Sequence, residues 1–284
     1  MAKVFLFLLF LFSIFYSNVE ATTEYEEKDS PISFKVEMVP WDLVNEILPR
    51  KSFFTIIDVE TGLQFRVQRR AGSRHADVQP LTFDDTKIMK KIYGGHWSWK
   101  RRAVIVKYGD QMLAASMHGM PHGAGALKNG FPGHFCIHFL GSTTHSSREP
   151  DIAHHLMLLK AGGKLDEYIS SADPYHLVEI FATGINQADR KIIRQTILPN
   201  LDNKKLFKLL RKIDIFSITN MSYLPLSDLE VLLTVEIPVE VEIYREGLGK
   251  ERKQIIFVLV RNSSVDRWYI QQNELIKELY HSKK

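Results

Sequence analysis

The sequence predicts an α+β protein, with a β-rich region followed by a smaller region of helices packed on a curved antiparallel sheet. Short apolar segments separated by glycine turns fill much of the first half of the chain, which is typical of strands joined by hairpins. After Pro174 the apolar residues recur with helical spacing. Between Leu229 and Ile243 they occupy every second position, as in a strand with one buried face.

The first half of the chain contains one clear helix among the expected strands. Thr82, as N-cap, with aspartates at 84 and 85 in the first turn, predicts a helix that runs to Tyr93. Gly94 and Gly95 then end it. A glycine-rich loop over 119–132 precedes the last strand of this region. The expected strands are 53–59, 65–67, 103–107, 112–117 and 134–140.

The second half reads as helices first and a sheet afterwards. Expected helices cover 174–183, 187–197 and 203–213, and expected strands cover 229–243, 254–261 and 268–270, before a terminal helix. This order resembles the NTF2-like α+β cone. The resemblance is one of pattern only, since no diagnostic motif accompanies it.

The N-terminus has the features of a secretory signal. Lys3 precedes an apolar run over 4–16, and Val19-Glu20-Ala21 offers small residues for cleavage after 21. The apolar run is shorter than the roughly 20 residues of a membrane span. We expect a signal peptide over 1–21, or an uncleaved anchor there, and no other contact with the membrane. A secreted or cell-wall-associated protein follows from either reading.

Composition suggests three further parts after the signal. A charged tether is expected over 22–40, a β-rich catalytic domain over 41–164, and an α+β accessory domain over 174–284. The net charge is +4 and the isoelectric point about 8.9, which suits residence near an anionic envelope polymer. This charge is too small to indicate nucleic-acid binding, and no basic stripe with interleaved aromatics is present. The sequence does not indicate an oligomeric state.

The chemistry-bearing residues gather around the single cysteine, Cys136. Nine of the eleven histidines lie between His75 and His155, and two of them, His134 and His138, flank the cysteine on either side. A lone cysteine cannot form an internal disulfide, so this residue is an inert buried thiol, a metal ligand or a nucleophile. Because side chains alternate along a strand, Cys136, His134 and His138 should share one face.

The segment around this cysteine resembles the L,D-transpeptidase (YkuD-type) catalytic domain. His118-Gly119 matches the His-Gly step of that family, and His134 and Cys136 match the histidine and the nucleophile of its next strand. The resemblance covers roughly 53–145. Three positions depart from the motif: Gly133 replaces Ser or Thr, Phe135 replaces Gly, and His138 replaces Arg or Asn.

The resemblance implies a cysteine acyl transferase that acts on peptidoglycan stem peptides without a cofactor. Cys136 would attack the carbonyl before the terminal D-alanine, and His118 would act as its base. His134 would orient the site. Substrate contacts are expected from His138, Gly119, Trp97 and Trp99, and an amine or water would resolve the thioester.

Two other functions are compatible with the same residues. His134, Cys136 and His138, with His118 or with His75 and Asp77 nearby, are a possible zinc site of a peptidoglycan hydrolase. A non-enzymatic envelope-binding module would use the histidines only for buried hydrogen bonds. His122 and His145 are expected in surface loops, and His154 and His155 on the solvated face of a helix.

Overall fold

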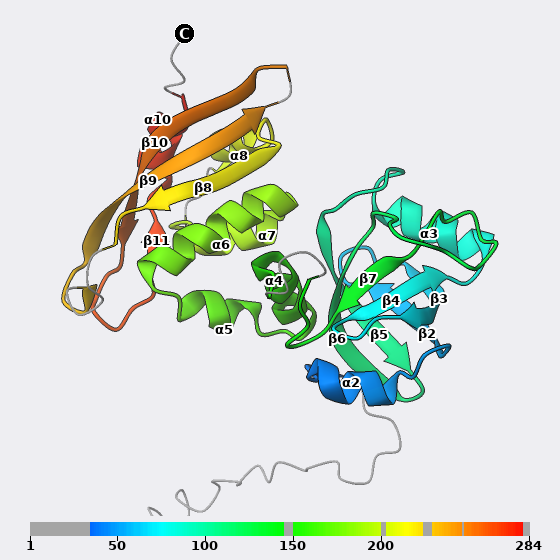
Figure 1. Cartoon of the computed structure of the whole chain (residues 1–284). Helices are drawn as coiled ribbons and strands as arrows, with labels where there is room; N and C mark the ends of the chain where they lie inside the picture. The colour runs from blue at the N-terminus through cyan, green and yellow to red at the C-terminus, as the bar shows by residue number, and fades with distance from the viewer. Residues whose placement is uncertain (1–34, 145–149, 200–202, 224–228, 246, 281–284) are drawn as a thin grey trace, which may run out of the picture. The chain divides into compact units, whose positions relative to one another are not determined.

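Six antiparallel strands from the first half of the chain form a closed β-barrel (Figure 1). The computed structural model describes residues 35–144, 150–199, 203–223, 229–245 and 247–280. The barrel strands are β2 (Phe53–Asp58), β3 (Gln64–Ala71), β4 (Ala76–Pro80), β5 (Arg101–Tyr108), β6 (Gln111–His118) and β7 (Phe135–His138). Their order is β6-β5-β2-β3-β4-β7, and β7 pairs back onto β6 to close the ring. A short strand, β1 (Val36–Glu37), joins β6 in parallel.

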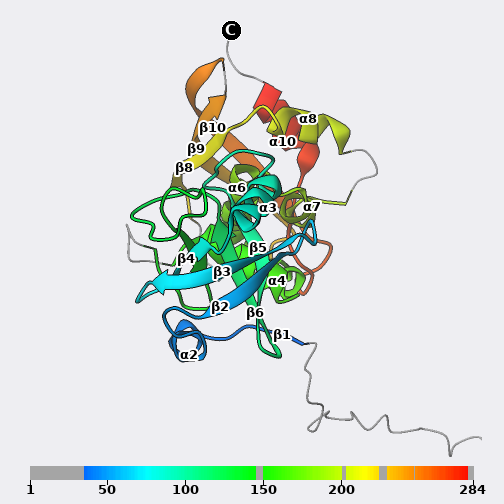
Figure 2. The ribbon, with the colours of Figure 1, turned by 90° about the vertical axis from the view of Figure 1, so that its right-hand side faces the viewer.

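Alternate residues of the barrel strands form a common apolar core. Phe54 and Ile56 of β2 and Phe65 and Val67 of β3 are buried in it. Two helices, α2 (Trp41–Ile47) and α3 (Phe83–Ile92), contribute apolar side chains to the same core. In Figure 2, α2 lies below β2 and β3, and α3 lies above them. Thr82 begins α3 with a capping box, in which its hydroxyl accepts from the backbone of Asp85 and the Asp85 carboxylate accepts from the backbone of Thr82.

A four-stranded antiparallel sheet with helices makes up the later part of the chain. The sheet has the order β11-β10-β9-β8 and comprises β8 (Ile215–Met221), β9 (Thr234–Arg245), β10 (Gly249–Val260) and β11 (Tyr269–Ile270). The helices are α5 (Leu165–Ser170), α6 (Pro174–Gln187), α7 (Arg190–Thr196), α8 (Lys204–Leu210) and α10 (Gln272–Tyr280). Every second residue of β9 from Val235 to Ile243 is buried in a second apolar core, shared with these helices.

Helix α4 (Ile152–Ala161) contacts both parts of the structure. It packs against β5 and β6 of the barrel and also against α5 and α6. Its buried side chains Leu156 and Met157 belong to the second core, to which Ala103 of β5 also contributes. Asp151 begins this helix by accepting a hydrogen bond from the backbone of His154.

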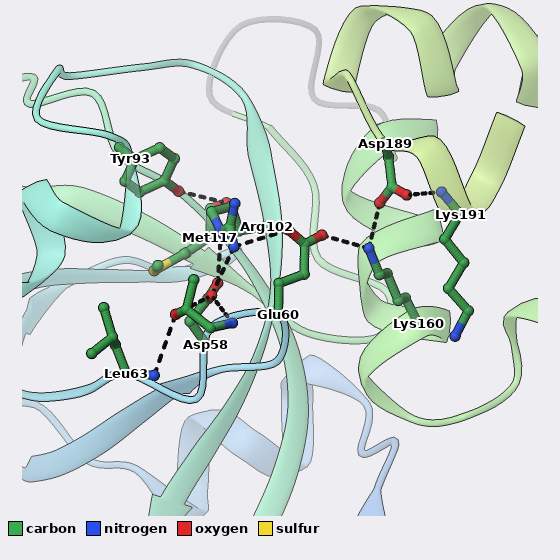
Figure 3. Close-up of polar contacts among 10 residues, drawn as sticks. Asp58, Glu60, Leu63, Tyr93, Arg102, Met117, Lys160, Asp189 and Lys191 are labelled. Atoms are coloured by element: carbon green, nitrogen blue, oxygen red, sulfur yellow. Dashed lines mark hydrogen bonds and ion pairs between the residues drawn. The ribbon is translucent and has the colours of Figure 1, made fainter. Parts of the chain in front are cut away.

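A chain of ion pairs joins the barrel to α4 and α7 (Figure 3). Arg102 of β5 donates twice to Asp58, at 2.6 and 2.7 Å, and pairs with Glu60 at 3.0 Å. Lys160 of α4 lies 2.5 Å from Glu60 and 2.5 Å from Asp189. Asp189 in turn accepts from the first backbone amides of α7.

The α+β class expected from the sequence is confirmed. The apolar segments separated by glycine turns correctly predicted the strand pairs β2–β3 and β5–β6, and the Thr82 cap of α3 is where it was expected. The three helices after Pro174 and the two long strands that follow are also present, with shifted ends. The boundaries 41–164 and 174–284 stay a prediction.

Several expectations of secondary structure were wrong or incomplete. The strand expected over 229–243 begins only at Thr234, and Val231 is 79% exposed. The strand expected over 134–140 is shorter, at Phe135–His138. The strands β4 and β8 were not expected from the sequence. The tether expected over 22–40 includes Val36 and Glu37, which pair with β6 in the structure.

The expected signal over 1–21, most of the tether and His145 lie outside the described residues. Among the helices that the structure does describe, none is both long and apolar enough to cross a membrane.

Candidate active site

Cys136 lies on the outer face of the barrel, where three neighbouring strands bring polar side chains together. Phe135 and Ile137 point into the barrel core, so Cys136 and His138 share the opposite face of β7, as the alternation predicted. Asp77 of β4 pairs in register with Cys136, and Ser116 of β6 pairs with His138. Residues paired in register lie on the same face of a sheet. His75 is two residues before Asp77, and His118 is two residues after Ser116, so both histidines lie on this face as well.

The sulfur of Cys136 contacts polar groups of His122 and Asp77. His122 Nε2 lies 3.2 Å from Sγ, and the thiol donates to Asp77 Oδ1 at 3.6 Å. The other nitrogen of the His122 ring, Nδ1, lies 3.2 Å from the carbonyl oxygen of Met120. A proton on Nδ1 would be donated to this carbonyl, which leaves Nε2 as the acceptor facing the thiol. We call the arrangement Met120 O, His122 and Cys136 the cysteine relay.

The glycine-rich loop places His122 by pairing it with His134. The two residues exchange backbone hydrogen bonds of 2.9 Å in each direction. Gly133 has φ +124°, and a Cβ on it would lie 2.5 Å from the carbonyl oxygen of His122. Buried Gln79 holds the same loop, donating to the carbonyl of Gly133 at 2.7 Å and accepting from the amide of Ala126 at 2.9 Å. Glycine at 133 is therefore required for the close approach.

His118, the base expected from the sequence, belongs to the same cluster. One of its ligand nitrogens, one of His122 and Sγ of Cys136 lie within 4.8 Å of one another. The ring centroids of His118 and His122 are 5.2 Å apart. The role of His118 as base stays a prediction. His122 lies in the expected loop, but it is half-buried and contacts the sulfur, which the sequence analysis did not indicate. The signal for His122 was a second His-Gly step, His122-Gly123, four residues after His118-Gly119.

Three further imidazoles form a stack beside the cysteine. His75 and His138 stack with ring centroids 4.7 Å apart, and His138 and His154 stack at 3.7 Å. His75 Nδ1 lies 2.8 Å from the Thr143 carbonyl oxygen, and Nε2 lies 3.2 Å from the Asp77 carboxylate. His154 was expected on a solvated helix face, which was wrong, because it is only 5% exposed. Burial, with His138 nearby, lowers the pKa of His154, so its ring is neutral at neutral pH.

His134 stands at the edge of the site rather than beside the sulfur. Its Nδ1 lies 3.0 Å from the Ala124 carbonyl oxygen, and its Nε2 lies 3.9 Å from Asp77. Its ring packs edge-on against His122, with centroids 4.5 Å apart. The predicted orienting role of His134 is therefore compatible with its contacts, which hold the ring of His122 in place.

A cavity of about 240 Å³ reaches the sulfur from the outside. Its lining residues are Trp99, Arg101, His118, His122, Cys136, His138, Thr144 and His154. Trp99, which is 50% exposed, covers the rings of His118 and His122 at centroid distances of 4.8 and 5.7 Å. Trp99 and His138, two of the residues expected to bind substrate, thus line this cavity.

The other two expected substrate contacts have structural partners. Trp97 packs edge-on against Phe131 at a centroid distance of 5.0 Å and contacts the barrel core. Gly119 lies against Tyr93, since a Cβ on it would be 2.4 Å from that ring. A role of either residue in substrate binding stays a prediction.

The environment of Cys136 keeps its sulfur protonated. Burial raises the pKa of the Cys136 thiol far above its usual range, and the Asp77 carboxylate beside it, which also accepts its hydrogen bond, raises it further. A nucleophilic thiolate would therefore form only as a base removes the proton during attack. His122 Nε2, at 3.2 Å from Sγ, is close enough to accept that proton.

Among the described residues, two overlapping groups of side chains have the composition of a metal site. One consists of His118, His122 and Cys136, and the other of His75, Cys136 and His138; within each group the ligand atoms lie within 4.8 Å of one another. Both groups contain Cys136. The set expected from the sequence, His134 with Cys136 and His138, differs from both.

The fold and the site together define a class: an α+β protein whose antiparallel barrel carries a cysteine–histidine cluster on its outer face. Comparisons with protein-family models, with curated proteins and with solved structures found no match to this chain. The L,D-transpeptidase and NTF2-like resemblances therefore stay predictions.

Proposed function

We propose that this protein is an exported cysteine acyl transferase that acts on peptidoglycan stem peptides, as an L,D-transpeptidase or L,D-carboxypeptidase. The cysteine relay is the observation that supports this function best. A nucleophile within hydrogen-bonding distance of a base, which is itself oriented by a third group, is the arrangement that covalent acyl transfer requires. Here the distances are 3.2 Å from Sγ to Nε2 and 3.2 Å from Nδ1 to the Met120 oxygen.

The relay supplies the proton transfers of both half-reactions. His122 Nε2 takes the thiol proton as Sγ attacks the peptide carbonyl carbon, and the C–N bond then breaks. The leaving amine of D-alanine receives that proton from Nε2, and a thioester remains on Cys136. An acceptor amine or water next loses a proton to Nε2 as it attacks the thioester, and the sulfur recovers the proton as it leaves.

The cavity beside the relay offers a cation for an anionic substrate. Arg101 lies in its wall, held by the carbonyl oxygen of Trp99 and the carboxylate of Asp151, each at 2.7 Å. Stem peptides end in a carboxylate, which a guanidinium binds with two parallel hydrogen bonds. We assign to Arg101 the contact that the family makes with the motif arginine, whose place His138 takes in this chain.

The later part of the chain, with its helices and curved sheet, would be an NTF2-like accessory domain that positions the catalytic barrel on the wall. The N-terminal signal would direct the chain out of the cytoplasm. A net charge of +4 favours contact with an anionic envelope polymer.

A mass-spectrometric labelling experiment tests the acyl transfer. Purified, chelator-treated protein is incubated with a carbapenem, a β-lactam that acylates cysteine enzymes of this resemblance, and the intact mass is measured. We expect a single covalent adduct on Cys136, which is absent from Cys136→Ser and retained in His155→Gln, a histidine variant outside the cluster. No adduct in folded wild-type protein, together with no cleavage of stem peptides, would rule the proposal out.

A zinc-dependent peptidoglycan hydrolase is the second candidate, because three possible ligands border a cavity with room for water. This function predicts that chelator-treated protein no longer cleaves stem peptides and that added zinc restores cleavage. The thiol enzyme predicts cleavage or exchange without metal.

A further inference from the structure

We propose that His118, His122 and Cys136 bind a thiophilic divalent cation, zinc above all, and that the bound cation switches off acyl transfer. The binding part stands on the geometry of the cluster alone. The inhibition part rests on the function proposed above, because it assumes that Cys136 is the nucleophile.

The donor set and its spacing fit zinc. One thiolate and two imidazoles are ligands that zinc prefers, and in a tetrahedral site their donor atoms are about 3.3–3.6 Å apart. Sγ of Cys136 and Nε2 of His122 are already 3.2 Å apart, and the His118 ligand atom lies within 4.8 Å of both. Small rotations of the two imidazoles would therefore bring all three atoms into the coordination distance.

The charge around the sulfur also favours a dication. Asp77 lies 3.6 Å from Sγ, so a thiolate would form beside a second negative charge. A zinc ion adds two positive charges, which balance the thiolate and the carboxylate. A coordinating metal also removes the thiol proton outright.

The group of His118, His122 and Cys136 is a better zinc site than the group of His75, Cys136 and His138. Both ring nitrogens of His75 are already engaged, with the Thr143 carbonyl at 2.8 Å and with Asp77 at 3.2 Å. His122 instead uses Nδ1 to contact the Met120 carbonyl, which turns Nε2 toward the sulfur. Such a hydrogen bond on the far nitrogen is the usual support of a metal-binding imidazole.

The position of the site explains why the cation would inhibit. His118, His122 and Cys136 all line the cavity, so a fourth coordination position would face the cavity. An occupied site uses the sulfur lone pair and Nε2 of His122, which are the nucleophile and the proton acceptor of the relay. Acyl transfer would then require the metal to leave.

Cobalt titration of the full, chelator-treated chain tests the ligand set without any activity measurement. We expect one equivalent of Co²⁺ to give a sulfur-to-cobalt charge-transfer absorption, and zinc to displace it. Cys136→Ser should lose this absorption. His118→Ala and His118→Gln should weaken binding by more than the roughly 10–100-fold that loss of an outer partner costs.

Two histidine variants serve as controls in the titration. His75→Ala tests the competing group, and His176→Ala removes a histidine outside the cluster; both should keep the affinity within a few fold once folding is verified by circular dichroism. Affinity lost in His75→Ala and kept in both His118 variants would overturn the ligand set. Absence of a sulfur-to-cobalt band in folded wild-type protein would overturn the site.

The carbapenem adduct separates the two proposals. We expect one equivalent of zinc to prevent the Cys136 adduct and a chelator to restore it. An adduct that forms equally with zinc bound overturns the inhibition. If the protein binds cobalt but forms no adduct even without metal, the metal site is supported and the acyl transferase is rejected. If zinc makes stem-peptide cleavage faster, the hydrolase is supported and inhibition by the cation is contradicted.

Discussion

Lys160 and Asp189 form an ion pair of 2.5 Å in which both side chains are almost fully buried, at 6% and 5% exposure. Glu60 contacts the same ammonium group from the barrel side, also at 2.5 Å. One lysine of α4 thus connects the β2–β3 turn of the barrel to the beginning of α7, as Figure 3 shows.

Replacing this lysine should destabilise the protein strongly. Lys160→Met leaves Asp189 buried without its cation, and breaking a buried pair in this way costs about 3–5 kcal/mol. Lys164→Met is the matched control, because Lys164 pairs with Glu167 at the exposed surface, where a pair contributes about 0–1 kcal/mol. Urea unfolding measures both. Equal free energies of unfolding for the two variants would show that the buried pair stabilises the protein no more than the exposed pair does.

The two histidines of the His-Gly steps should differ in their effect on acylation. His122→Gln removes the base of the cysteine relay and should slow carbapenem acylation about 10²–10⁴-fold, the usual contribution of general base catalysis. His118→Gln keeps the relay and should have a smaller effect. Stopped-flow or time-resolved intact mass gives the rates. The reverse order would return the role of base to His118, as the family resemblance implies.

The stability of the protein should fall at alkaline pH because of Cys136. Burial and then Asp77 raise the thiol pKa in the folded state, whereas the unfolded thiol titrates near about 8.5. The contribution of this group to stability is therefore complete below about pH 8.5 and decreases above it, by about 1.4 kcal/mol per pH unit.

Cys136→Ala provides the comparison for this pH dependence. Urea unfolding of both proteins between pH 7 and 10 should show a steeper loss for the wild type above pH 8.5. Parallel curves would mean that the thiol ionises equally easily in the folded state.

Gly133 should be required for the position of His122. An alanine at Gly133 must adopt φ +124° and place its Cβ 2.5 Å from the His122 carbonyl oxygen. Gly141→Ala is the control, since Gly141 also has a positive φ, +75°, but a Cβ there meets no atom within 4 Å.

Both glycine variants should therefore lose stability from backbone strain, by about 1–2 kcal/mol. Only Gly133→Ala should in addition lose most of the carbapenem adduct, because it displaces the base. Adduct formation by Gly133→Ala at the rate of Gly141→Ala would contradict the proposed role of the loop.

Local patterns were sufficient for much of the fold. Apolar segments joined at glycine turns predict the hairpins β2–β3 and β5–β6, and the Thr82 cap predicts the start of α3, since both depend on neighbouring residues only. The strand β4 was missed although Ala76 and Val78 alternate with the polar residues Asp77 and Gln79, because it is only five residues long. Aspartate and proline are depleted in strands, so Asp77 and Pro80 favour a loop at this position.

The site was predicted in part for the same reason. Cys136 and His138 share a face of β7 because of strand periodicity, which the sequence contains. The contact of His122 with Cys136 depends on how a loop folds back, and the approach of His154 depends on α4 packing against β6. Such contacts between distant segments are set by tertiary packing, and residue spacing alone does not encode them.

Helix α4 serves both the second core and the site. Its apolar side chains complete the second core, and its His154 stacks on His138 of the barrel. A fragment that ended before this helix would keep the nucleophile but leave the imidazole stack open to water. A chain cut there would lose the packing of α4 behind the site, even though it would keep every residue of the relay.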